Sequence, residues 1–196
     1  FGDLVDLMML DTRLWGRDQP GEPGRGEDLF SEERTMLGLD QEEWLADTLM
    51  SADARWQVLG QQVLFGQLKV DGGVLNPDQW DGYEATRQRV YDALDAAGVV
   101  DLVVLTGDIH TSWANDLCRD PADPEQYDPE TQVGSQGVEL VVPGVTSGGL
   151  DLGGPEVLQL LAPFNPHIRW VDIEHRGYLV LDVTHERVQC AWRHFV

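Results

Sequence analysis

The chain has 196 residues, a length that fits one large domain or a large part of one. It carries 35 Asp and Glu against 13 Lys and Arg, a formal net charge of -22, and Lys69 is its single lysine. So acidic a surface excludes nucleic-acid binding through a basic face and docking to an anionic membrane through a polybasic patch. Two interpretations of the acidity stay open: a solvated surface, or carboxylates that bind cations.

The cysteines and the chain ends leave the cellular compartment undecided. Cys118 and Cys190 are compatible with one disulfide or with two free thiols. The sequence has no apolar run near the roughly 20 residues of a membrane span, and no signal-peptide pattern. Both ends, residues 1–10 and 188–196, fall in strand patterns. We therefore expect the chain to be a fragment of a longer protein.

Strands and helices alternate in the first part of the chain. Leu4–Leu10 is an apolar run typical of a buried strand, and residues 16–35 are a loop rich in Gly and Pro. Asp40 and Glu43 have the spacing of a capping box, which predicts the start of a helix. The expected apolar face of that helix comprises Trp44, Leu45, Thr48 and Leu49.

A second strand, a helix and a third strand follow. Residues 56–60 and 63–65 read as a strand with a bend at Gly60, and residues 66–82 as a loop. Tyr83–Ala97 has helical periodicity and ends before Gly98. The charged residues expected outside that helix are Arg87, Arg89, Asp92 and Asp95. Val99–Leu105 is a nearly continuous apolar strand of the kind covered on both faces, so the order predicts an α/β fold.

The last third of the chain reads as antiparallel. Residues 119–137 form a polar loop, expected like residues 16–35 to lie on the surface without a core role. A strand over residues 138–142, a glycine-rich stretch and a short helix over residues 155–161 come next. Three strands are then predicted, over residues 169–174, 178–183 and 188–192. The last two flank the four-residue hairpin loop Thr184–Arg187.

The segment Leu102–Trp113 is the most informative for chemistry. A buried strand runs into Gly107 and then presents Asp108 and His110, at the strand end where α/β sheets bind ligands. In extended backbone the two side chains point the same way, and a carboxylate with an imidazole makes a two-point grip on a metal. Gly107 is expected to permit a turn that a side chain would obstruct. The alternative stays open that Asp108 caps a turn over residues 111–117 and His110 is a core histidine.

Other polar residues give weaker signals. His167, His175, His185 and His194 read as turn, surface or packing residues. Ser147 lacks the glycine spacing of a nucleophile elbow, and no lysine follows its glycines as in a phosphate-binding loop. Cys118 has no evident base or electropositive surround that would make it a nucleophile. Asn115 and Asp116 are candidates for additional oxygen ligands to a hard cation.

Eight segments, in order along nearly the whole chain, resemble the C-terminal half of the PhoD-type alkaline phosphatases, a family that includes phospholipase D-like diesterases. The central segment is Leu105–Ala114, with the sequence Leu-Thr-Gly-Asp-Ile-His-Thr-Ser-Trp-Ala. The other seven are residues 1–7 with 10–13, 37–45, 56–63, 78–83, 145–147, 165–168 and 176–179. The fold that this resemblance implies is the metallophosphoesterase sandwich, two facing sheets flanked by helices (αββα).

The resemblance also implies a chemistry. The family uses a ferric ion with calcium ions, and a metal-bound hydroxide attacks phosphorus. By that similarity Asp108 binds a calcium-type metal and His110 binds the iron, while the other ligands lie in an upstream half that this sequence lacks. Trp113, with Asn115 or Asp116, is then expected to support the ligands from behind.

We therefore expect residues 1–196 to be the C-terminal part of one catalytic domain of a secreted or periplasmic phosphomonoesterase or phosphodiesterase. Its partners are a phosphate ester and the upstream half of the domain, possibly on a separate chain, and this chain alone is expected to be inactive. Two alternatives remain: a phospholipase D-like diesterase, and a catalytically inactive sandwich that serves as a binding module.

Overall fold

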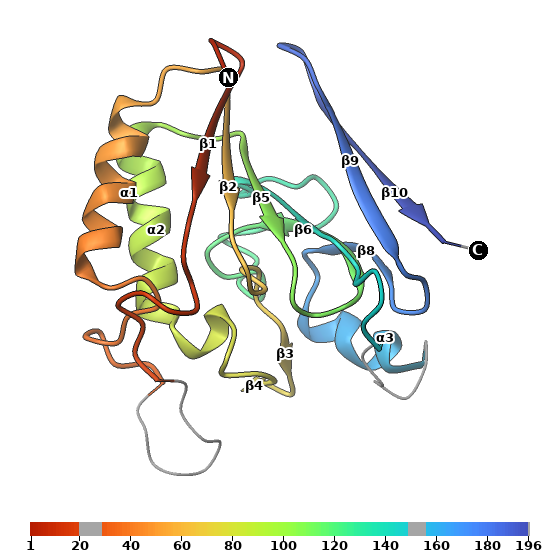
Figure 1. Cartoon of the computed structure of the whole chain (residues 1–196). Coiled ribbons are helices and arrows are strands. Elements are labelled where there is room, and N and C mark those ends of the chain that lie inside the picture. The colour runs from red at the N-terminus through yellow and green to blue at the C-terminus, as the bar shows by residue number, and fades with distance from the viewer. Residues whose placement is uncertain (20–28, 149–155, 196) are drawn as a thin grey trace.

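The computed structural model describes residues 1–19, 29–148 and 156–195 and is built on a six-stranded sheet (Figure 1). The order of the strands across the sheet is β1-β2-β5-β7-β6-β8. In that order they are Val5–Met9, Trp56–Gly60, Leu102–Thr106, Gly137–Val141, Ser112–Leu117 and Ile168–Asp172. The expected α/β class is confirmed.

The strand directions bring several chain segments to one edge of the sheet. Strands β1, β2, β5 and β7 are parallel, and β6 is antiparallel to both β7 and β8. The carboxyl ends of β1, β2, β5, β7 and β8 and the amino end of β6 therefore share one edge, which we call the carboxyl edge. Ligand sites of α/β sheets form at this edge.

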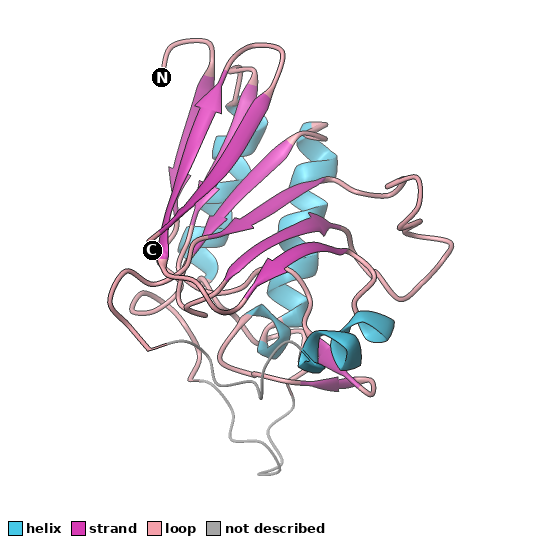
Figure 2. Cartoon of the chain, turned by 90° about the vertical axis from the view of Figure 1, so that its right-hand side faces the viewer, coloured by secondary structure: helices cyan, strands magenta, loops and turns pink. Residues whose placement is uncertain are grey.

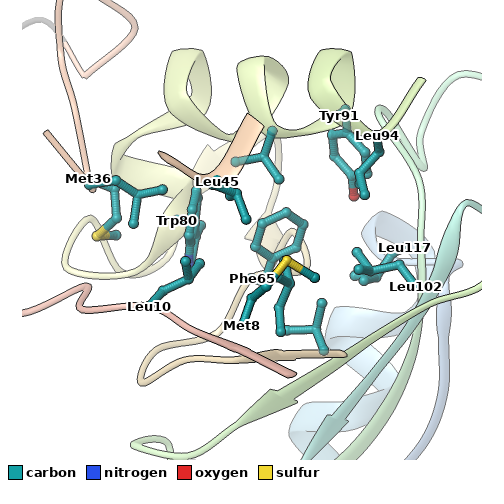
Figure 3. Close-up of a cluster of buried hydrophobic side chains, with 14 of the residues drawn as sticks. Met8, Leu10, Met36, Leu45, Phe65, Trp80, Tyr91, Leu94, Leu102 and Leu117 are labelled. Atoms are coloured by element: carbon teal, nitrogen blue, oxygen red, sulfur yellow. The ribbon is translucent and has the colours of Figure 1, made fainter. Parts of the chain in front are cut away.

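Two helices, α1 (Leu39–Ser51) and α2 (Glu84–Ala97), cover one face of the sheet (Figure 1). Successive side chains of a strand point to opposite faces, so Leu102 and Val104 of β5 join the cluster under the helices. Aromatic rings fill its centre: the ring centroids of Phe65 and Trp80 lie 4.7 Å apart, and those of Phe65 and Tyr91 5.7 Å apart (Figure 3). None of the helices in the described ranges is long and apolar enough to cross a membrane.

On the opposite face, the described residues place a hairpin, β9 (Gly177–Val183) and β10 (Val188–His194), which lies on the side of the sheet away from α1 and α2 (Figure 2). The predicted hairpin loop at residues 184–187 is confirmed. The hairpin does not reach all of the face: Leu7 and Met9 of the edge strand β1 remain 42% and 62% exposed. The expectation that the first strand is buried is therefore wrong for one of its two faces.

The remaining elements are short. A two-stranded hairpin, β3 (Lys69–Val70) with β4 (Gly73–Val74), interrupts the loop expected over residues 66–82. A 3-10 turn, Trp80–Gly82, ends that stretch. The short helix expected over residues 155–161 is present as α3 (Glu156–Leu161), and a second 3-10 turn follows at Ala162–Phe164.

The start of α1 differs from the sequence expectation. Its N-cap is Gly38, with a φ of 73° and no side-chain cap, so the capping box at Asp40 and Glu43 is wrong. Thr35 instead fixes the two residues before the helix, because its Oγ1 accepts hydrogen bonds from the N–H groups of Leu37 and Gly38. Trp44, expected on the apolar face, is 44% exposed, whereas the expected Leu45 and Leu49 are buried.

The second helix forms where it was predicted, but one charged residue that was expected on its outer face is buried. Gly98 ends α2 in the left-handed conformation, as expected. Arg87 was expected outside but is only 2% exposed. Its Nη1 donates to Oδ1 of Asp81 at 2.7 Å and to the carbonyl of Phe65 at 3.2 Å. A buried guanidinium needs a charged partner of this kind. Helical periodicity in the sequence cannot reveal a partner that lies outside the helix.

Residues 63–65 were expected to extend the second strand and instead form a buried, irregular segment. A carboxylate from another strand satisfies the backbone here: Glu139 of β7 accepts the N–H groups of Phe65 and Gly66 at 2.7 and 2.9 Å. Glu139 also accepts from Thr106 and Asn115. Burial raises the pKa of Glu139, and these four hydrogen bonds act against that rise.

The two long loops are only partly surface features. Residues 119–137 have no helix or strand before Gly137, but Tyr127 is buried and its hydroxyl donates to Asp116 at 2.7 Å. In the other loop, residues 20–28 lie outside the described ranges. The flanking Arg17 has a side chain only 6% exposed and donates to the hydroxyl of Tyr83. The expectation of no core role is therefore wrong at Arg17 and Tyr127.

Candidate functional site

The segment after β5 makes a tight reversal at the carboxyl edge. Asp108 and His110 have φ values of 68° and 60°, in the left-handed region, and the N–H of Ile109 donates to the carbonyl of Gly107 at 2.8 Å. The expectation that the two ligand residues lie in extended backbone is therefore wrong. Gly107 itself does not need to be glycine, since a Cβ there would meet its nearest neighbour, the Gln62 carbonyl, at 3.9 Å.

The conformation of this turn is costly. A non-glycine residue in the left-handed region costs about 1–2 kcal/mol. Such strain persists only where surrounding structure enforces it, and it concentrates at functional sites. Packing supplies the enforcement here: Ile109 is buried in a cluster with Trp113, Leu64 and Val141. The indole N–H of Trp113 donates to Oγ1 of Thr111, which fixes the start of β6 directly behind the turn.

The strained turn leaves ligand atoms of both candidate residues accessible. Asp108 is exposed, and His110 is half-buried. Nδ1 of His110 lies 3.0 Å from the carbonyl oxygen of Gly148. A carbonyl only accepts, so Nδ1 carries the proton and Nε2 keeps the free electron pair that a metal requires. The carboxylate of Asp108 and Nε2 of His110 are therefore both groups of the kind that bind metal ions. The alternative that Asp108 caps a turn over residues 111–117 is wrong, because residues 112–117 form β6.

Two neighbouring strands bring further polar groups to the carboxyl edge. Thr12, just beyond β1, donates through both its N–H and its hydroxyl to Oε1 of Gln62, each at 2.7 Å. Nε2 of Gln62, just beyond β2, donates back to the carbonyl of Leu10. These hydrogen bonds fasten the end of β1 to the segment that follows β2.

Arg13 is the cation that the sequence did not single out. Its side chain is 39% exposed, and Nη1 donates to Oδ2 of Asp78 at 2.9 Å. That hydrogen bond raises the pKa of Arg13, and the charge of Asp108 adds to the rise. Burial acts to raise the pKa of Asp78, but hydrogen bonds from Arg13 and Arg17 hold it below its usual value. The sequence could have pointed to Arg13 through its position, three residues beyond Leu10 at the end of a predicted strand.

The three residues expected to support the ligands lie along β6. Trp113 is fully buried beneath the turn, as that role requires. Asn115 and Asp116 lie further along the strand, where Nδ2 of Asn115 donates to Glu139 and Asp116 accepts from Tyr127. Their observed contacts therefore go to the interior and to the loop 119–137.

His167 and the two cysteines are structural residues. His167 is 1% exposed, and burial lowers its pKa to about 4, so the ring is neutral near pH 7. Both cysteines are free thiols. Burial raises the pKa of Cys118 to about 12 and that of Cys190 to about 11, so both stay protonated and are poor nucleophiles.

Comparisons with known proteins agree with one another. The sequence matches the family described as PhoD-like phosphatases over residues 1–192. It is 33% identical over 199 residues to alkaline phosphatase D of Bacillus subtilis (strain 168), a match that covers 98% of this chain and 33% of that relative. A solved structure of PhoD superposes with a TM-score of 0.82 at 32% identity, covering 98% of this chain and 37% of that one. The chain thus spans about a third of the length of these relatives.

Proposed function

Because this chain belongs to the PhoD-like phosphatase family, a family of phosphoesterase hydrolases, we propose that it forms the C-terminal part of a metal-dependent catalytic domain that hydrolyses phosphate esters. The observation that carries the proposal is the turn at the carboxyl edge. There Asp108 and His110 are both held in left-handed backbone, and Nε2 of His110 is left free.

Asp108 and His110 are the residues that would hold the metals, which the family resemblance identifies as calcium and ferric iron. Bound there, the cations would neutralise the charge of the phosphate ester and lower the pKa of water. The Gly148 carbonyl holds His110 in the tautomer that binds through Nε2. Trp113 and the buried Ile109 keep the turn from relaxing.

Arg13 would orient the substrate. Its guanidinium is held by Asp78 and is exposed at the same edge of the sheet as Asp108. Guanidinium groups bind phosphate oxygens through paired hydrogen bonds, and the single lysine of the chain lies in β3. Arg13 is therefore one cationic group through which this acidic chain would contact the phosphate.

The part of the sheet that the β9–β10 hairpin leaves uncovered supports the proposed second half of the domain. An open pocket of about 370 Å³ lies between β1, β5, β7 and β9, and the exposed Leu7 and Met9 line it. Contiguous apolar surface of this kind marks a contact area. The upstream half would cover it and complete a sandwich of two facing sheets, and it would bring the remaining metal ligands. The secreted or periplasmic location that the family resemblance implies is part of the same proposal.

The test uses the complete protein that contains this chain. Asp108→Ala and His110→Ala should each lower hydrolysis of nitrophenyl phosphate by at least a hundredfold and reduce the content of bound metal. Asp71→Ala is the matched control, because Asp71 also has a left-handed φ, of 50°, but lies in the exposed β3–β4 turn. Normal activity and normal metal content in His110→Ala would refute the assignment.

The same preparation separates the alternatives. Faster hydrolysis of bis-nitrophenyl phosphate than of nitrophenyl phosphate would favour the phospholipase D-like diesterase. A protein without stoichiometric metal and without turnover of either ester would favour the binding module. The chain expressed alone should be poorly soluble and inactive with iron and calcium supplied, and a well-folded monomer that turns over a phosphate ester would contradict the two-half domain.

A further inference from the structure

Three potential metal ligands from separate elements meet beside the strained turn. Asp172 is the last residue of β8, His175 lies in the connection to β9, and His194 is the last residue of β10. One ligand atom from each lies within 4.8 Å of the other two. Asp172 and His194 are half-buried and His175 is 52% exposed, so the group is open on one side.

We propose that Asp172, His175 and His194 form a second binding site, for a divalent transition metal such as zinc, separate from the site at Asp108 and His110. Oδ2 of Asp172 lies 2.8 Å from Nδ1 of His175 and 3.8 Å from Nδ1 of His194. Ligands at about 2.0–2.1 Å from a tetrahedral zinc lie about 3.3 Å from one another, between these two distances. Small side-chain rotations therefore suffice to place a metal between the three atoms.

Neighbouring groups already orient two of the three ligands. Oδ1 of Asp172 accepts the N–H groups of Glu174 and His175, each at 3.0 Å, which leaves Oδ2 directed at the imidazoles. Nε2 of His194 lies 3.3 Å from Oγ of Ser112, so Nδ1 faces the carboxylate. Metal-binding histidines use their second nitrogen in this way.

The type of ligand indicates the type of metal. Two imidazoles and one carboxylate suit zinc, copper or nickel better than calcium or magnesium, which prefer oxygen ligands. Three protein ligands leave a fourth position for water or another donor. The site therefore differs in metal class from the calcium-type site proposed for Asp108.

Two other interpretations of the cluster account for less. Ser112, His194 and Asp172 follow one another as in a nucleophilic triad, but Ser112 is fully buried and out of reach of a substrate. The 3.8 Å between His194 and Asp172 is also too long for the hydrogen bond that such a triad needs. The ion pair of Asp172 with His175 and the stacking of the two imidazole rings, whose centroids lie 5.0 Å apart, explain the pairwise contacts but give no role to the convergence of three ligand atoms.

A metal at Asp172, His175 and His194 would also affect the site at Asp108 and His110, because one loop connects the two. The N–H of Gly177 donates to the carbonyl of Gly144, and Nε of Arg176 donates to the carbonyl of Ser147. The same loop holds His110 through the carbonyl of Gly148. A metal on His175 would fix the turn that anchors this loop, and the loop in turn fixes the imidazole of His110.

The test measures metal binding and does not depend on catalysis. Cobalt, a spectroscopic substitute for zinc, is titrated into the complete protein carrying both Asp108→Ala and His110→Ala, and zinc is then added as a competitor. One equivalent of cobalt should bind with the visible spectrum of nitrogen and oxygen ligands. Adding His175→Ala or His194→Ala should weaken binding at least tenfold. His185→Ala, a change at an exposed histidine near Asp3, should leave it unchanged.

Two results would overturn the second site, and neither depends on the phosphatase proposal. One is the absence of stoichiometric cobalt binding in the protein that lacks Asp108 and His110. The other is wild-type affinity and spectrum after His175→Ala, a substitution at an exposed turn that leaves the core intact. Circular dichroism of each variant confirms folding, and Ser112→Ala should keep the cobalt spectrum because the hydroxyl only orients His194.

Discussion

Replacing Asp81 by alanine should destabilise the protein far more than any surface charge change, because Asp81 neutralises a cation inside the core. Asp81 and Arg87 are each 2% exposed and meet at 2.7 Å. The other oxygen of Asp81 accepts the N–H of Leu68 at 2.7 Å. After the substitution, the Phe65 carbonyl would be the hydrogen-bond acceptor left for Nη1 of Arg87 among the described contacts.

The expected loss in the free energy of unfolding is about 3–5 kcal/mol, the cost of leaving one member of a buried ion pair uncompensated. A Coulomb estimate has the same size: unit charges roughly 4 Å apart at an effective dielectric constant of 20 attract by about 4 kcal/mol. Removing both charges should cost much less, because well-packed apolar residues of similar volume often replace a buried pair without loss. Asp81→Leu combined with Arg87→Met should therefore recover most of the stability.

Urea unfolding of the complete protein, followed by circular dichroism, measures these differences. With a slope of about 2 kcal/mol per molar urea, Asp81→Ala should lower the unfolding midpoint by about 2 M. Asp101→Ala, which breaks the exposed pair with Arg55, is the matched control and should cost less than about 1 kcal/mol. A loss below 1 kcal/mol for Asp81→Ala, or a double variant no more stable than the single one, would refute the reasoning.

Three further predictions concern the carboxyl edge and the core. Arg13→Ala should lower kcat/KM for a phosphate ester by about 10- to 100-fold, because it removes one charge-assisted hydrogen bond to the substrate. Arg13→Lys should recover part of the lost kcat/KM. Unchanged kinetics in Arg13→Ala would rule out a contact between Arg13 and the phosphate. His110→Asn and His110→Ala should both be inactive, yet the Asn variant should resist urea better by about 1 kcal/mol because Asn tolerates left-handed backbone; the opposite order would argue against strain at this residue. His167 has a folded pKa lowered by burial to about 4, so the unfolded chain takes up the proton first and stability should fall by about 3 kcal/mol as the pH drops from 6.5 to 4. Urea titrations across that range test this, and His167→Gln should flatten the decline; an equally steep decline in that variant would contradict the assignment.

The sequence alone was sufficient for features whose signals are local. Helix α2 was predicted because an apolar periodicity runs to Gly98, which ends it in the left-handed conformation. The buried strand β5 and the hairpin with its loop at residues 184–187 follow from runs of apolar residues bounded by turn residues. The family followed from short motifs in a fixed order along the chain, and the comparisons confirm it.

Tertiary structure decided what depends on residues far apart in the chain. Residues 63–65 have the composition of a strand, yet their segment turns away because a carboxylate of β7, more than 70 residues later, takes its backbone N–H groups. By periodicity Arg87 fits an exposed position of the helix. It is buried because Asp81, in the preceding turn, neutralises its charge. The left-handed backbone of Asp108 and the approach of His175 to His194 likewise arise from packing between separate elements. A local pattern specifies the conformations that a segment favours, but long-range contacts supply the free energy that selects a costly conformation or buries a charge.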